Sequence, residues 1–218
     1  MSSNTAIVIG ATGLVGSHLV KQLSESSTFN RVVSITRRPV GYQSAMVENH
    51  VVDFSRLSDY SALFAGDVFF SCLGTTAKQA GSLAAQRLVD FDFQLEAAKL
   101  AKQQGVAHYL LVSSSGANAS SLSAYLKMKG ELEQAVELLD FDATTIIQPS
   151  LLLGERPDAR LAEGLASCIL PSVCKLPGLT KFRPIQGADV AKKLIECASR
   201  ENMQGVLRLR LDQVFPNS

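Results

Sequence analysis

The sequence predicts an α/β protein built on a doubly wound parallel sheet, and two observations carry this prediction. Apolar runs of strand length alternate with segments of helical periodicity along the chain, as in a parallel sheet with helices on both faces. The first run, Ala6–Ile9, leads through the glycine-rich turn Gly10–Gly16 into a helical segment at Ser17–Leu23. The chain has 218 residues, 46% of them hydrophobic, which is enough for one sizeable core. We therefore expect a single domain over residues 1–218.

The glycine-rich turn predicts a dinucleotide-binding site. Gly10 allows a sharp turn after the strand, Gly13 lets a pyrophosphate approach the backbone, and Gly16 lets the helix pack closely. The start of the following helix offers free N–H groups and the positive end of the helix dipole to phosphates. An ordinary turn is the alternative, but the strand–turn–helix context favours a dinucleotide. The candidate cofactor-binding residues here are Gly10, Thr12, Gly13, Leu14, Val15 and Gly16.

The residues after the second predicted strand, Arg31–Thr36, bear on the choice of cofactor. This position faces the adenosine ribose in a dinucleotide fold, where an acidic residue would accept from a free 2′-hydroxyl. Arg37 and Arg38 stand there instead, and paired guanidinium donors suit a phosphate in charge and geometry. Two solvated arginines at a strand end are the alternative. Given the glycine turn, we expect NADP rather than NAD.

A third strand is predicted at Asn49–Phe54. Asp53, with Phe54 beside it, would lie near the adenine, where a carboxylate can accept from the exocyclic amine. Asp53 could equally be the N-cap of a helix at Leu57–Phe64, and the residues alone do not separate these alternatives.

The fourth strand, Asp67–Cys72, reads as fully buried and ends at Leu73, Gly74 and Thr75. A glycine there lets the backbone pass close to the middle of the cofactor, although an ordinary turn glycine is the alternative.

A long helix is predicted next, over Leu83–Gln104, because its apolar residues recur at helical spacing. Gly105 ends it, and a fifth strand, Tyr109–Val112, runs into the serine-rich turn Ser113–Gly116. Ligands of such sheets bind beyond the carboxyl ends of the strands. The turns after the predicted strands, which carry the candidate residues, should therefore lie together at the carboxyl edge of the sheet, as a single binding site requires.

Tyr125 and Lys129 form a pair suited to hydride chemistry. They are four residues apart in a helix expected to start near Leu122, so their side chains share a face. A phenol has a pKa of ~10, and a neighbouring ammonium favours the phenolate and brings that pKa towards the working range. The lysine can also hold the nicotinamide ribose, and a serine after the fifth strand can hydrogen-bond the reacting carbonyl. Such a pair alone is more often a solvated helix face, but a serine-ended strand and a dinucleotide fold make it a strong signal.

The rest of the chain completes the sheet. A sixth strand is predicted at Ala143–Gln148, after which Pro149 takes the chain out of the ladder. Residues 151–181 would form a small lobe on the substrate side, in which Arg156 is a surface ion-pair partner or, less commonly, an anion ligand. A helix at Ala188–Ala198 and a strand at Val206–Leu211 then return to the main domain.

These motifs together resemble the short-chain dehydrogenase/reductase superfamily, and within it the atypical branch of the Tat-interacting metastasis-suppressor oxidoreductase type. The resemblance implies a Rossmann fold, NADP binding, hydride transfer between nicotinamide and a carbonyl or alcohol, and a Ser-Tyr-Lys catalytic set. It assigns Ser114, Tyr125 and Lys129 to that set; Ser114 is chosen over Ser115 because the related branch has a lysine at the place of Ser115. It also implies that Pro149 and Ser150 line the nicotinamide. The resembling stretches are Gly10–Gly16, Leu88–Asp92, Leu111–Ala117, Tyr125–Glu131, Pro149–Arg156, and Arg183–Ile185 with Ala188–Ala191.

Charge and cysteine content narrow the partners. With 21 basic and 20 acidic residues the net charge is +1, so we expect neither a nucleic-acid nor a membrane partner, but a small carbonyl or alcohol substrate. The four cysteines include no CxxC pair, so we expect free thiols and no metal site. No secretory signal or disulfide framework is recognisable, and the expected location is the cytoplasm. An alternative function is an NADPH-binding regulator read by a protein partner, and the oligomeric state stays open.

Overall fold

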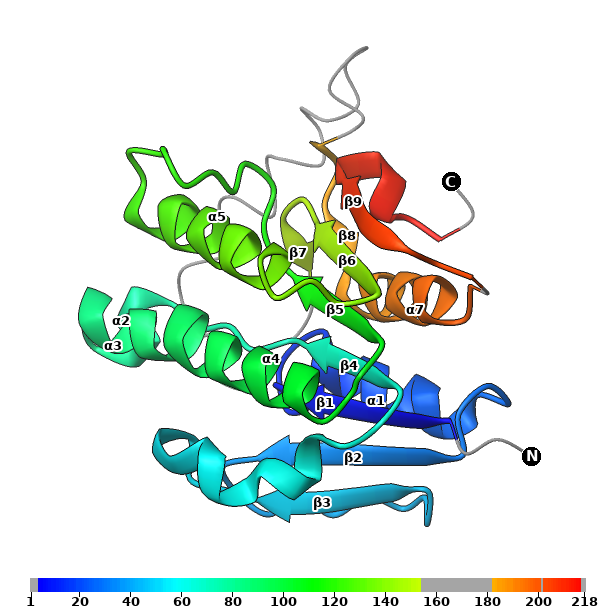
Figure 1. Cartoon of the computed structure of the whole chain (residues 1–218). Helices are drawn as coiled ribbons and strands as arrows, with labels where there is room; N and C mark the ends of the chain where they lie inside the picture. The colour runs from blue at the N-terminus through cyan, green and yellow to red at the C-terminus, as the bar shows by residue number, and fades with distance from the viewer. Residues whose placement is uncertain (1–3, 154–181, 201, 217–218) are drawn as a thin grey trace.

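The computed structural model describes residues 4–153, 182–200 and 202–216, and in these the main sheet has seven strands. Their order is β3-β2-β1-β4-β5-β6-β9 and every neighbouring pair is parallel (Figure 1). The predicted doubly wound sheet is therefore confirmed. The strands are β1 (Thr5–Ile9), β2 (Arg31–Thr36), β3 (Val47–Val51), β4 (Val68–Ser71), β5 (His108–Val112), β6 (Ala143–Gln148) and β9 (Gly205–Arg210).

Helices cover both faces of this sheet, because the strands are apolar on both sides. In β1, Ala6 and Val8 pack into one core with helices α1 (Gly16–Glu25) and α7 (Gly187–Ala198). Ile7 and Ile9, which point the other way, pack into a second core. The helices over that second face are η1 (Phe54–Phe64), α4 (Phe93–Gln103) and α5 (Ala124–Glu137).

Shorter elements connect these layers. Before α4 lie α2 (Ala77–Ala80), α3 (Leu83–Arg87) and a π-helical turn, η2 (Leu88–Asp92). The two-stranded pair β7 (Leu152–Leu153) and β8 (Ile185–Gln186), and the 3₁₀ turn η4 (Leu211–Val214), complete the described elements. Residues 154–181, most of the expected substrate-side lobe with Arg156, lie outside the described residues.

Most predicted elements match the observed ones to within three residues at their ends, and two differ in a way that affects the site. The predicted single helix Leu83–Gln104 is interrupted at η2, where the Gln94 side chain donates to the carbonyl oxygen of Asp90 at 2.9 Å. A π-turn inserts one extra residue and re-aims the side chains around it. The third strand begins and ends earlier than expected. Its end lies before Asp53, because Asp53 caps η1 instead of continuing the strand.

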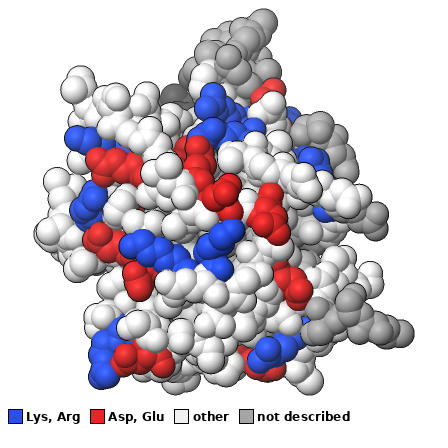
Figure 2. Space-filling model, viewed as in Figure 1, with Lys and Arg blue, Asp and Glu red and all other residues white. Residues whose placement is uncertain are grey.

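The surface carries mixed charge on the side of α4 and α5. Figure 2 shows basic and acidic side chains interspersed over this face. Among the described helices, none is both long and apolar enough to cross a bilayer.

Candidate cofactor and catalytic site

The parallel sheet brings the predicted site residues to one edge. Since all seven strands run the same way, the turns after β1, β2, β3, β4, β5 and β6 lie at the carboxyl end of the sheet (Figure 1). The candidate residues lie on these turns or, as Gly16 and Phe54 do, at the first residue of the helix that follows, apart from Tyr125 and Lys129, which α5 supplies. Within residues 4–153, 182–200 and 202–216, no group of three or more His, Cys, Asp or Glu side chains is placed to hold a metal ion.

The glycine turn after β1 owes its shape to two close backbone approaches. Gly10 has a φ of 77°, and a Cβ there would overlap the backbone of Cys72 at the end of β4. A Cβ on Gly16 would overlap the carbonyl of Gly10. The first glycine therefore lets β1 and β4 end side by side, and the last lets α1 start directly on the turn.

The start of α1 offers free hydrogen-bond donors. The N–H of Gly13 is used within the turn, where it donates to the Gly10 carbonyl at 2.9 Å. The amides of Leu14 and Val15 donate no hydrogen bond within the described part of the chain. Unpaired N–H groups at a helix N-terminus are suited to phosphate oxygens, so this turn fits the pyrophosphate of a dinucleotide.

Both arginines after β2 are available to an anion. Arg37 and Arg38 are exposed, and neither forms an ion pair with another described residue. Their use by a 2′-phosphate stays a prediction.

Asp53 is an N-cap in the structure. Its Oδ1 accepts from the amide of Ser55 at 2.9 Å and from the Ser55 hydroxyl at 2.7 Å, and these bonds lower the pKa of the carboxyl. The ring of Phe54 packs against Phe93 in the core, so of Phe54 mainly the backbone is available to a ligand. A contact of Asp53 with adenine stays a prediction beside this capping role.

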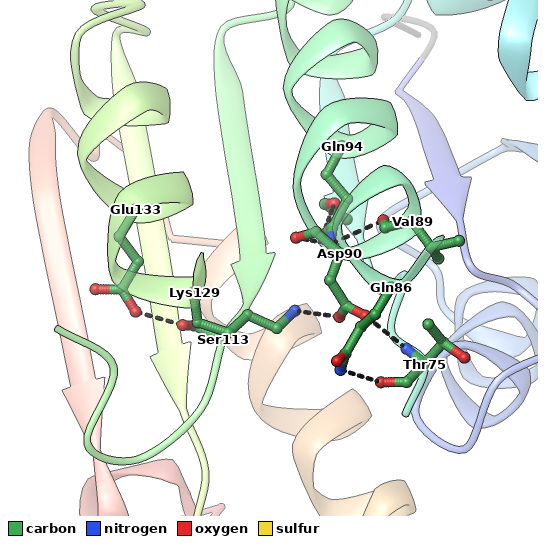
Figure 3. Close-up of polar contacts among 9 residues, drawn as sticks. Thr75, Gln86, Val89, Asp90, Gln94, Ser113, Lys129 and Glu133 are labelled. Atoms are coloured by element: carbon green, nitrogen blue, oxygen red, sulfur yellow. Dashed lines mark hydrogen bonds and ion pairs between the residues drawn. The ribbon is translucent and has the colours of Figure 1, made fainter. Parts of the chain in front are cut away.

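The turn after β4 is held by the helix that follows it. The amide of Thr75 donates to Asp90 Oδ2 at 3.0 Å, and Gln86 Nε2 donates to the Thr75 carbonyl at 3.1 Å (Figure 3). Both helical side chains are buried. These two hydrogen bonds tie Thr75, and with it the turn after β4, to the helical segment that follows.

The same aspartate pairs with the predicted catalytic lysine. Lys129 Nζ lies 3.2 Å from Asp90 Oδ1, and both side chains are almost completely buried (Figure 3). Asp90 Oδ1 has no hydrogen-bond partner besides this ionic contact. A buried ammonium needs a counter-charge, and Asp90 supplies it from η2.

Tyr125 stands one turn before Lys129, as predicted, in the first turn of α5. The Ser123 hydroxyl caps this helix by accepting from the Leu126 amide at 3.5 Å. Tyr125 is half-buried, and its hydroxyl makes no hydrogen bond with another described residue. The phenol is thus free to contact a substrate.

Of the three serines after β5, Ser113 has a structural role. Its hydroxyl donates to the buried Glu133 of α5, which also accepts from Gln148 Nε2 at 2.9 Å through each oxygen. This network joins β5, β6 and α5 beneath the site.

The backbone separates the other two serines. The Ser113 amide donates to the Ile147 carbonyl at 2.8 Å, and the Ser115 amide donates to the Pro149 carbonyl at 3.0 Å. The donors and the acceptors are each two residues apart, so the extended pairing of β5 with β6 continues as far as Ser115. Ser115 should then lie on the α5 side with Ser113, and Ser114 on the opposite side. The backbone geometry favours Ser115, whereas the resemblance favours Ser114. Neither hydroxyl forms a hydrogen bond with another described residue, so both stay candidates.

The last two candidates follow β6. Pro149 ends the ladder with its carbonyl paired to the Ser115 amide, and the Ser150 hydroxyl donates to the carbonyl of Arg183. Ser150 therefore ties the end of β6 to the chain that leads into β8. Nearby, burial raises the pKa of the Cys72 thiol to about 12, so this group stays neutral at the edge of the site.

Sequence reasoning assigned no role to Asp90, although it lay in a resembling stretch. A signal was present: Gln86, Asp90 and Gln94 are spaced four residues apart, as a polar stripe on one helix face, and all three are buried. Polar residues buried at helical spacing indicate a hydrogen-bonded network rather than a solvated face.

The chain is similar in sequence to a known protein family and to individual proteins of other organisms. Residues 10–201 match the model of a family described as NAD(P)H-binding. Protein HTATIP2 of Rattus norvegicus is 40% identical over 170 residues, which cover 76% of this chain and 70% of that protein. The mitochondrial protein FMP52 of Debaryomyces hansenii is 37% identical over 207 residues, covering 92% and 90%.

Solved structures agree in fold. MoeE5 in complex with UDP-glucuronic acid and NAD has a TM-score of 0.73 at 18% identity, covering 96% of this chain and 76% of that one. The oxidoreductase ylbE of Lactococcus lactis has a TM-score of 0.65 at 18% identity, covering 94% and 89%. At these identities the likeness concerns the fold.

The expected cytoplasmic location is wrong, because it is contradicted by the names of the fungal relatives. Fungal FMP52 proteins at 34–37% identity are named mitochondrial. The expectation rested on the lack of a secretory signal and of disulfides, and these features concern the secretory route. Mitochondrial import uses amphipathic, arginine-rich segments, which that reasoning did not address.

Proposed function

Because the chain belongs to the NAD(P)H-binding family, we propose that it is an NADP-dependent oxidoreductase of the short-chain dehydrogenase/reductase type, acting on a small carbonyl or alcohol substrate. The observation that carries this proposal is the placement of Tyr125 and Lys129 one turn apart on α5, with Lys129 paired to the aspartate that holds the β4 turn. A dinucleotide turn and a proton-transfer pair thus share one edge of the sheet.

Each part of the edge has a distinct role in this proposal. The free amides of Leu14 and Val15 hold the pyrophosphate, Arg37 and Arg38 hold the 2′-phosphate, and the backbone at Leu73–Thr75 and Pro149–Ser150 lines the remainder. The bound nicotinamide cofactor supplies or accepts the hydride. An ammonium has three donors, so Lys129 can keep Asp90 as counter-ion and still bind ribose hydroxyls.

Tyr125 moves the proton that accompanies the hydride. In reduction its hydroxyl donates a proton to the carbonyl oxygen as the carbonyl carbon gains the hydride, and in oxidation the phenolate takes the alcohol proton. A serine hydroxyl donates a hydrogen bond to the same substrate oxygen. The hydroxyls of Tyr125, Ser114 and Ser115 form no hydrogen bond with another described residue, which supports this assignment.

Tyr125→Phe tests the catalytic assignment. The substitution removes only the hydroxyl, so fold and NADPH affinity should be nearly unchanged, while turnover of aldehydes, ketones and quinones should fall by ~10²–10⁴-fold. Tyr60→Phe in η1, outside the site, is the matched control. In the same assay, Ser114→Ala and Ser115→Ala decide which hydroxyl serves the substrate, because only one of the two should lower the rate strongly.

Two results would contradict this assignment. If Tyr125→Phe turns over as fast as the parent, Tyr125 is not the acid/base. If the parent binds NADPH tightly but reduces no carbonyl compound in a broad panel, the alternative of a cofactor-binding regulator read by a protein partner is favoured.

Cofactor choice is tested by replacing both arginines after β2. The parent should bind NADPH more tightly than NADH, and Arg37→Ala with Arg38→Ala should remove that preference, because each charge-assisted hydrogen bond contributes about 1.5–3 kcal/mol at best. Isothermal titration calorimetry with both cofactors measures it. Arg56→Ala, which removes an exposed arginine paired with Asp59, is the control. Equal affinities of the parent for the two cofactors would exclude the NADP assignment.

A further inference from the structure

The segment that carries Arg37 and Arg38 is held at both of its ends by side-chain hydrogen bonds. At one end, the Thr36 hydroxyl donates to the carbonyl of Arg38 at 2.8 Å. At the other, the amide of Val40 donates to Asn49 Oδ1 at 2.8 Å. Pro39 between them restricts the backbone further, through its own fixed φ and the bias it places on the residue before it.

One side chain connects these two ends. Asn49 Nδ2 donates to the Thr36 hydroxyl at 2.8 Å and to the Ser34 carbonyl at 3.2 Å, while its Oδ1 holds Val40. All of the hydrogen bonds of this side chain therefore go to β2 and the segment after it, although Asn49 belongs to β3. Asparagine is disfavoured within strands, so a specific use for this residue is expected.

The order of residues 36–40 matters for the binding of a phosphate by Arg37 and Arg38. Arg37 and Arg38 are exposed and have no carboxylate partner among the described residues, so their side chains gain no order from ion pairs. Binding a phosphate through both guanidiniums requires their Cα atoms to be correctly spaced and directed before the ligand arrives, because ordering a loose segment on binding weakens affinity. The hydrogen bonds of Asn49 and Thr36 provide that order.

We propose that Asn49 is a specificity-determining residue that acts through the backbone: it positions Arg37 and Arg38 so that the protein selects a 2′-phosphorylated adenosine over one with a free 2′-hydroxyl. Asn49 does not itself bind the phosphate in this scheme, and is a positioning residue. The inference rests on the proposed NADP preference and adds the residue that enforces it.

Binding of two adenosine fragments tests the proposal without any dependence on catalysis. Calorimetry with 2′,5′-ADP and with 5′-AMP measures the contribution of the 2′-phosphate in each variant. Asn49→Ala should weaken 2′,5′-ADP by about tenfold, as loss of one well-aligned charge-assisted hydrogen bond would, and leave 5′-AMP within about twofold. Glu48→Gln, on the same strand but paired with Arg31, is the matched control and should change neither affinity.

A second pair of variants keeps the test decisive if Asn49→Ala does not fold. Thr36→Val removes the hydroxyl that links Asn49 to the Arg38 carbonyl and keeps the side-chain shape, whereas Thr36→Ser keeps the hydroxyl. Thr36→Val should lower the preference for 2′,5′-ADP and Thr36→Ser should retain it. Amide hydrogen exchange in the unliganded protein should also become faster at Val40 in Asn49→Ala.

The outcomes separate this inference from the proposed function. If the parent binds 2′,5′-ADP and 5′-AMP equally, the NADP preference itself is overturned, and the inference with it. If the parent prefers 2′,5′-ADP and both Asn49→Ala and Thr36→Val keep the full preference, the role of Asn49 is overturned while the NADP assignment stands.

Discussion

At the scale of single residues, the site depends on one buried charge pair. Lys129 and Asp90 face each other at 3.2 Å with almost no exposure, and the other oxygen of the carboxylate holds the Thr75 amide. A buried pair adds little net stability compared with apolar residues, but removing one partner leaves an uncompensated charge. Asp90 therefore links the predicted catalytic lysine to the turn after β4.

Replacing the aspartate by its amide isolates that charge. Asp90→Asn keeps an oxygen that can accept from Thr75 but leaves the Lys129 ammonium without a counter-ion, so we expect a loss of about 3–5 kcal/mol in the free energy of unfolding. Denaturant unfolding measures it. Asp92→Asn, an exposed aspartate of the same turn, should change stability by less than about 0.5 kcal/mol. Equal stability of the two variants would show that the pair has no such role.

The two members of this pair differ in how far sequence predicts them. Lys129 could be predicted because its spacing from Tyr125 depends only on α-helical periodicity, which α5 obeys. The partnership with Asp90 could not, since Asp90 lies in the π-turn η2, which departs from the regular helix that the apolar spacing predicts. Likewise, a run of three serines gave no way to see that Ser113 is committed to Glu133.

At the scale of elements, the strands were the most predictable part and their ends the least. The second and sixth strands, Arg31–Thr36 and Ala143–Gln148, were predicted with the observed bounds, because burial on both faces makes each a continuous run of strand-forming residues. The third strand was misplaced because β3 is a half-buried edge strand without such a run. It ends before Asp53, whose side chain caps η1 by accepting from the Ser55 amide.

The pairing of β5 with β6 contains a titratable group that should make stability depend on pH. His108 is buried in β5, its Nε2 lies 2.9 Å from the Thr145 hydroxyl of β6, and burial lowers the pKa of the imidazole from 6.5 to about 4. The folded state thus disfavours the protonated form that the unfolded chain adopts in acid. The stability this neutral histidine contributes is present above pH 6.5 and is lost as the pH falls from 6.5 through about 4.

The expected loss from this one group is about 2–3 kcal/mol on going from pH 7 to pH 4. His108→Gln can keep a hydrogen bond to Thr145 but cannot titrate, so its stability should fall less steeply over this interval. Urea unfolding at a series of pH values measures both proteins, and His50→Gln, at a partly exposed histidine of β3, is the control. Parallel pH profiles for the parent and His108→Gln would contradict the prediction.

At the scale of the whole molecule, the strand order divides the candidate site into two halves. The order β3-β2-β1-β4-β5-β6 puts the turns predicted to bind the adenosine end on one side of β1, and those predicted to bind the nicotinamide end, with α5, on the other. The sequence predicted the doubly wound parallel sheet, because strands and helices alternate along the chain, but it did not predict this strand order. The substrate could not be predicted, because the lobe expected at 151–181 carries no recognisable motif. Residues 154–181 also lie outside the described residues.

This division predicts which parts of the chain a cofactor fragment protects from hydrogen exchange. At short exchange times, 2′,5′-ADP should slow exchange in the turns after β1 and β2, most of all at the free amides of Leu14 and Val15. It should leave the segment Ser113–Gly116 beside α5 unchanged, because no adenosine group reaches across β1 and β4 to that part of the edge. NADPH, which carries the nicotinamide, should slow exchange in both halves. Mass spectrometry of peptides from both halves makes the comparison, with β9 as an internal control that neither ligand should affect, and protection of Ser113–Gly116 by 2′,5′-ADP alone would show that the cofactor does not lie along the edge in this direction.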